Sequence, residues 1–218
     1  MFSAARPVRA WIMLIAPTTS RRALPTPNRI HIMITRLFSS RGLVALLFIL
    51  SVAALHADVV DKVIDKSNPG NRAADGSRYV IVICARGGLP FGHAFVIWGL
   101  EGATAKVSSE TEFGFYPAPG SNPIGMGLGA NVPGDVKAEA LSRSINLINH
   151  RLIVTVDKAV FDDTNKLISK WQTGDYNLYA RNCKNFAWDV AKKVGLAGAA
   201  PVAAQLPLTY VAALIDAN

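Results

Sequence analysis

The stretch Asn182-Cys183-Lys184-Asn185-Phe186-Ala187 decides how the rest of this chain is interpreted, because it joins a polar turn directly to an amphipathic segment. Apolar side chains recur at helical spacing from Phe186 to Val194. Asn182 is a favourable N-cap and Gly195 a favourable stop, so a helix is predicted between them. Cys183 would then lie in the first helical turn, where free backbone N–H groups and the helix dipole stabilise a thiolate and lower its pKa.

Most of the chain upstream of this helix has the composition of β-strands. Four apolar segments are rich in β-branched and aromatic residues and are separated by turn residues. They span residues 79–84, 92–99, 106–116 and 151–156. The glycine- and proline-rich segment 117–135 predicts a long irregular loop.

The helical patterns follow the strands. One helix is predicted from Asp157 or Asp162 to about Trp171, and another from Leu206 to Ile215, on either side of the Cys183 helix. Strands first and helices last indicate an α+β fold, with an antiparallel meander sheet and helices packed on one face.

The N-terminal segment has the features of a signal peptide. Arg36 and Arg41 precede an almost wholly apolar run over residues 42–55, and a small-x-small motif ends at Ala57. We expect cleavage near Ala57 and export to the periplasm or the medium, with membrane contact only through the signal segment before cleavage. An uncleaved anchor is the alternative, although the run is shorter than the roughly 20 apolar residues of a membrane span.

The same segment decides the domain organisation and the charge. Residues 1–57 are predicted to be a leader, of which 1–32 are either a misassigned start or a long natural extension. Residues 58–77 are predicted to be a linker or short helix. The folded domain is predicted to span 78–218. Seven of the 23 basic residues and none of the 15 acidic ones lie in 1–57, so the net charge of +8 belongs mostly to the leader. A basic face that binds nucleic acid is therefore not expected.

A cysteine nucleophile needs a base, and His93 is the best candidate because it opens a predicted strand after a glycine-rich loop. In such a pair the thiolate attacks a carbonyl carbon, the imidazole protonates the leaving group, and water or another acceptor resolves the thioester. No metal or cofactor is expected, because the acidic group Asp157, Asp162 and Asp163 has no His or Cys beside it and is more consistent with helix capping.

A third group should orient the imidazole. If the hairpin turn centres near residues 102–103, the residue opposite His93 is near Glu112; a tighter turn moves it to Glu110, and Ser109 remains an alternative. A carboxylate at that position would raise the pKa of the imidazole. The residues expected to contact substrate are Tyr116, Tyr179 and Asn182.

Together these features resemble the circularly permuted papain-like superfamily, which includes permuted NlpC-type peptidases and lecithin:retinol acyltransferase-like enzymes. The resemblance spans about residues 80–210 and rests on Gly92-His93-Ala94-Phe95-Val96, Gly114-Phe115-Tyr116-Pro117, Tyr176-Asn177-Leu178 and Asn182-Cys183-x-x-Phe186. In permuted members the histidine strand precedes the nucleophile helix, as here. The resemblance implies a permuted papain-like fold with Cys183 as nucleophile and His93 as base. The family's third residue, often a second His, has no counterpart, since His150 lies beyond the predicted hairpin.

Three functions are compatible with these residues and their order. The first is an exported cysteine hydrolase that cleaves an amide bond in a peptide or in cell-wall peptidoglycan. The second is an acyltransferase or lipid hydrolase that uses the same two residues, with the loop 117–135 covering an apolar groove. The third is a non-enzymatic secreted module closed by a Cys84–Cys183 disulfide, which an exported protein could form.

Overall fold

The computed structural model describes residues 12–13, 60–88, 91–104, 106–139 and 147–218. The predicted signal peptide and its cleavage near Ala57 lie outside these residues, and the domain boundary at residue 78 stays a prediction. Within the leader, only β1 (Ile12–Met13) is described, and it pairs with β5. No helix in the described part of the chain is long and apolar enough to cross a membrane.

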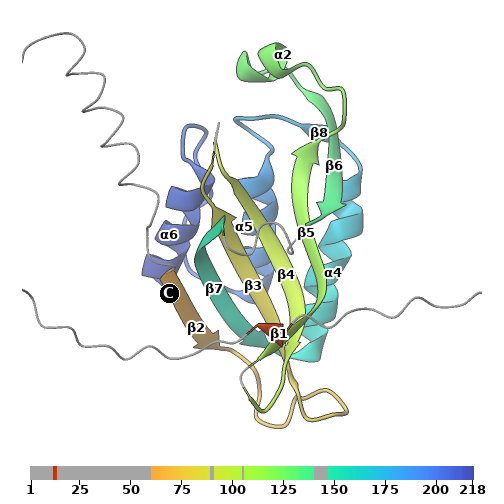
Figure 1. Ribbon diagram of the computed structural model, residues 1–218, viewed down its shortest axis with the longest axis vertical. Coiled ribbons are helices and arrows are strands. Elements are labelled where there is room, and N and C mark those ends of the chain that lie inside the picture. Colours follow the sequence, from red (N-terminus) through yellow and green to blue (C-terminus); the bar gives the residue numbers. More distant parts are fainter. Residues whose placement is uncertain (1–11, 14–59, 89–90, 105, 140–146) are drawn as a thin grey trace, which may run out of the picture. The chain divides into compact units, whose positions relative to one another are not determined.

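A mostly antiparallel sheet organises the fold, in the strand order β2-β7-β3-β4-β5-β6-β8 (Figure 1). Its centre is a meander of consecutive antiparallel neighbours, as the sequence predicts. The meander consists of β3 (Arg78–Arg86), β4 (His93–Glu101), β5 (Val107–Pro117) and β6 (Val132–Ala138). The short strand β8 (Asp175–Tyr176) pairs with β6 at one edge.

Helices cover one face of this sheet (Figure 1). They are α4 (Lys158–Gln172), α5 (Cys183–Val194) and α6 (Pro207–Ala217). The main apolar core lies between them and the sheet, and it includes Ile81, Val96 and Leu152. Strand residues of the alternate parity, such as Val82 and Phe95, form a smaller buried cluster on the other face. Burial on both faces explains why the run 79–84 is continuously apolar rather than alternating.

The two strands beside β3 on its outer side differ from the expectation. The segment around residues 151–156 does not extend the meander; it is β7 (Ile148–Val156), and it pairs antiparallel with β3 on the other side. Residues of the predicted linker 58–77 form β2 (Val60–Asp65), which pairs in parallel with β7. An edge strand contributes backbone hydrogen bonds while its side chains stay largely exposed. The polar composition of β2 is therefore typical of a linker as well as of an edge strand.

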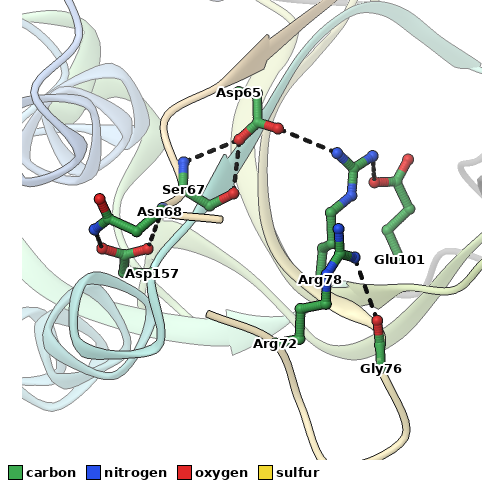
Figure 2. A network of polar contacts seen from close by, with 8 residues as sticks. All are labelled: Asp65, Ser67, Asn68, Arg72, Gly76, Arg78, Glu101 and Asp157. Carbon is green, nitrogen blue, oxygen red and sulfur yellow. Dashed lines mark hydrogen bonds and ion pairs between the residues drawn. The ribbon is translucent and has the colours of Figure 1, made fainter. Parts of the chain in front are cut away.

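The rest of the predicted linker is tied to the sheet by polar contacts, which Figure 2 shows. Arg78 at the start of β3 contacts Asp65, at 3.2 Å between Nη1 and Oδ2, and also Glu101 at the end of β4. The backbone N–H of Asn68 donates to Asp157 Oδ1 at 2.7 Å. These contacts join the end of β2 to β3, β4 and the start of α4.

The segment 117–135, predicted to be one irregular loop, contains the short helix α2 (Pro123–Gly127) and the first part of β6. The start of β6 is not predicted from the sequence, because it contains Pro133 and Gly134 and both residue types are depleted in strands. The structure explains Gly134, since a Cβ at that position would overlap the ring of Phe115. Its N–H donates to Gly174 O at 2.9 Å.

Phe186 is the side chain that docks α5 on the sheet, and its replacement should destabilise the whole domain. It is fully buried, with ring centroids 6.4 Å from Trp98 of β4 and 5.7 Å from Trp171 of α4. We expect Phe186→Ala to lower the free energy of unfolding by about 3–5 kcal/mol in urea denaturation, because the cavity cannot fully collapse. The exposed Ile124→Ala should change it by less than about 0.5 kcal/mol. Equal effects of the two variants would contradict this packing.

Candidate active site

The first turn of α5 positions Cys183. Asn182 is the N-cap, as predicted: its Oδ1 accepts from Lys184 N at 2.9 Å, and Asn185 Oδ1 accepts from Asn182 N at 3.0 Å, which completes a capping box. Gly195 ends the helix in the left-handed conformation. Cys183 is buried at the first helical position, at the positive end of the helix dipole.

His93 is the first residue of β4 and reaches Cys183 from the sheet. Gly92 before it has φ +71°, and a Cβ there would lie 2.6 Å from Arg86 O, so only glycine fits this entry to the strand. The side chains of His93 and Cys183 line the same cavity and interact closely enough that each shifts the pKa of the other. The structure therefore brings together the two residues that the sequence paired across ninety positions.

The contact favours the charged forms of both groups. Burial alone would raise the pKa of Cys183, but the hydrogen bond to His93, its charge, the Ala94 N–H and the Lys184 charge together lower that pKa below its ordinary value. Burial alone would lower the pKa of His93, but its interactions with Cys183 and Glu139 raise it. The two pKa shifts act together, because each favours transfer of the thiol proton to the imidazole.

The predicted register of the β4–β5 hairpin is wrong, and neither Glu112 nor Glu110 is opposite His93. Glu101 faces Val107, so the turn centres near residue 104 rather than 102–103. A bulge then adds one residue: Trp98 faces Thr111 and Gly99 faces Ser109, which leaves Glu110 between the two pairs.

Both changes move the partner of His93 towards the C-terminal end of β5. Glu112 lies opposite Ile97. The residue next to His93 is instead Tyr116, whose ring stacks on the imidazole with centroids 4.1 Å apart. Ser109, the further alternative, lies opposite Gly99 and so is also distant from His93 along the strand.

Glu139 is the carboxylate that faces His93, and no sequence pattern singled it out. Its Oε1 lies 3.2 Å from His93 Nε2, and its Oε2 lies 3.1 Å from Arg86 Nη1. Tyr116 Oη donates to Oε1 of the same carboxylate. Burial alone would raise the pKa of Glu139, but His93, Tyr116 and Arg86 together lower it, so the group is held as a carboxylate. Glu139 directly follows β6, and a residue beyond an unrecognised strand could not be placed beside His93.

Gly114 makes room for this contact. It lies on β5 opposite Phe95, and a Cβ there would overlap both His93 Nε2 and Glu139 Oε1. Arg86 completes the arrangement, because its Nη2 donates to Tyr116 Oη at 3.0 Å while its Nη1 holds the carboxylate. Strand β4 carries the imidazole, and β3, β5 and β6 supply or precede the groups around it.

A cavity of about 510 Å³ opens beside Cys183 and His93. All three residues expected to contact substrate line it, although their side chains have further partners. Tyr116 bonds to Glu139, Tyr179 Oη donates to Gly127 O at 2.6 Å, and Asn182 Nδ2 donates to Leu178 O at 2.8 Å. Their predicted role in substrate binding stays a prediction.

The structure does not contain the disulfide considered as an alternative. Both Cys84 and Cys183 are free thiols. Cys84 belongs to the cluster on the face of the sheet away from the helices, whereas Cys183 belongs to the core between sheet and helices. Burial raises the pKa of the Cys84 thiol far above its usual range, so this group is inert. Among the described residues, no cluster of His, Cys, Asp and Glu could hold a metal ion.

The contact with Glu139 predicts how the pKa of His93 responds to substitution. In a Cys183→Ser background, which removes the coupled thiol, Glu139→Gln should lower the His93 pKa because the neighbouring negative charge is lost. Glu112→Gln is the matched control and should leave it largely unchanged. Titration of the His93 Cε1–H signal by NMR, identified by its absence in His93→Ala, measures both. A larger decrease from Glu112→Gln would contradict the observed register.

Comparisons with known proteins find a distant structural likeness. No family model matches the chain, and no curated protein matches it. Among solved structures, the crystal structure of the type VI secretion system effector TseH aligns at 17% sequence identity and a TM-score of 0.42, over 66% of this chain and 88% of that one. The resemblance to the permuted papain-like superfamily stays a prediction.

Proposed function

We propose that this protein is an exported cysteine hydrolase that cleaves an amide bond in a peptide or cell-wall peptide. The observation that carries the proposal is the placement of Cys183, in the first turn of α5, and His93, at the start of β4, on the wall of one cavity, where each shifts the pKa of the other. A nucleophile with a lowered pKa in contact with a base that a third group orients is the arrangement used in nucleophilic catalysis.

The mechanism follows from the positions of these groups. His93 accepts the thiol proton, and the Cys183 thiolate attacks the carbonyl carbon of the substrate. The carbon–nitrogen bond then breaks as the imidazolium returns the proton to the departing amine. Water, activated by His93, attacks the resulting thioester, which releases the carboxylic acid and restores the thiol. The backbone N–H of Cys183, at the helix N-terminus, can stabilise the negative oxygen of each tetrahedral intermediate.

Glu139 would act in every step through His93. Its carboxylate lies 3.2 Å from Nε2, and we assign the other ring nitrogen to exchange the proton with sulfur. Arg86 and Tyr116 fix the carboxylate in turn. We assign these three residues a positioning role.

A second candidate keeps the same two reacting residues but changes the substrate. An acyltransferase or lipid hydrolase would receive the acyl group on Cys183 and pass it to an acceptor or to water. The observation that favours it is the set of apolar and aromatic side chains along the cavity, including Phe91, Leu178 and Leu206.

Alkylation by iodoacetamide tests the thiolate–imidazolium pair. Because the Cys183 pKa is lowered, labelling should continue below the pH at which an ordinary thiol becomes protonated, and it should stop when the pH falls through the pKa of Cys183. In His93→Ala the labelling profile should move to higher pH. Mass spectrometry locates the label, and Cys84 is the internal control, unlabelled until the protein unfolds. An unchanged profile in His93→Ala would contradict the pairing.

Product analysis tests the amide reaction itself. Peptidoglycan fragments and mixed peptides incubated with the protein should yield new amino termini, detected by mass spectrometry. Cys183→Ser should lose this activity by a factor of at least about 10³, because the hydroxyl is a far weaker nucleophile at neutral pH. Equal product from wild type and Cys183→Ser would refute the proposal.

A further inference from the structure

Exposed apolar side chains gather around the mouth of the active-site cavity. Phe91, Tyr179 and Leu206 line the cavity and are 50%, 44% and 49% exposed. Leu128 and Val202 are also exposed, and each is the chain neighbour of a residue that lines the cavity. Single exposed apolar residues are ordinary on a protein surface, but several of them from different segments on or beside one cavity indicate a binding surface.

The charged groups of the cavity wall are already paired within the protein. Arg86 is bound to Glu139 and Tyr116. Lys184 is buried, and its Nζ donates to the backbone oxygens of Val202 at 2.9 Å, Ala203 at 3.3 Å and Gln205. Among the described residues that line the cavity there is no Asp or Glu. A charged substrate side chain would therefore enter without a partner, which is costly.

The contacts that hold this wall also fix the shape of the mouth before any substrate arrives. Lys184, next to the nucleophile, anchors the segment 202–205 along one side. At another part of the mouth, Tyr179 Oη donates to Gly127 O at 2.6 Å, and Asn177 Nδ2 donates to Gly129 O at 2.9 Å. These bonds attach the α2 segment to the turn that precedes α5. A preformed apolar mouth loses little ordering entropy when it binds an apolar group.

We propose that the substrate carries an apolar group on the acyl side of the bond that is cleaved, either an alkyl chain or the side chain of an apolar amino acid. The inference rests on the proposed function, because it assumes that the carbonyl of that acyl group reacts with Cys183. Burial of each additional methylene should then raise kcat/KM roughly fourfold until the cavity is filled. Acidic and basic acyl groups should be poor substrates.

A series of 4-nitrophenyl esters tests this with a constant leaving group. One arm compares acetate, butyrate and octanoate; the other compares N-acetyl-leucine with N-acetyl-glutamate and N-acetyl-lysine. We expect kcat/KM to rise along the first arm, and leucine to exceed both charged acyl groups at least tenfold. Larger kcat/KM values in the first arm indicate a lipid-like acyl group, whereas larger values in the second arm indicate a peptide. Rates with Cys183→Ser are subtracted throughout.

Matched surface variants separate the mouth from general effects. Phe91→Ser and Leu206→Ser should each reduce kcat/KM for octanoate or N-acetyl-leucine about tenfold and reduce it less for acetate, since the longer groups make more contact with these side chains. Val63→Ser, which removes an equally exposed apolar side chain from β2, should change neither.

The outcomes are distinct for the two proposals. If Cys183 is alkylated in the His93-dependent way and esters are hydrolysed, but without preference for apolar acyl groups, the proposed function stands and this inference is overturned. A preference for glutamate or lysine would overturn it equally. If Cys183 is neither alkylated in that way nor acylated by any ester, both proposals fall together.

Discussion

The packing of α5 against the sheet is the constraint on which the site depends. Phe186 is enclosed between Trp98 of the sheet and Trp171 of α4, three residues after the proposed nucleophile. Because a helix is stiff over one turn, fixing Phe186 also fixes Cys183 beside the first residues of β4. The same burial that stabilises the domain therefore sets the distance between a thiol and an imidazole that are remote in sequence.

Buried charges near the imidazole compensate one another. When the thiol proton lies on the imidazole, the Cys183 thiolate and the Glu139 carboxylate are matched by the His93 imidazolium and the Arg86 guanidinium. A single buried charge would be strongly unfavourable, whereas a paired and hydrogen-bonded set is tolerated. Gly114 permits this set by leaving a space on β5 that any side chain would fill.

The two ends of the central strands have different roles. At one end, Arg78, Asp65 and Glu101 join the strand ends through the polar network in Figure 2. At the other end, Arg86 and His93 belong to the candidate site, and the surrounding loops form its mouth. The polar network holds the strands together at one end. The loops at the other end can therefore carry reactive and binding residues on a rigid framework.

The sequence by itself determined the features that local spacing encodes. Asn182 and Gly195 bound α5, Cys183 occupies its first turn, and the order of strands and helices gives the α+β class. Only the tertiary structure decided which carboxylate faces His93, because a turn near residue 104 and a bulge beside Trp98 shift the register. Glu139 reaches the site only through pairing of β6 with β5, and that pairing depends on Gly134 accommodating the ring of Phe115, a packing contact that no local pattern records.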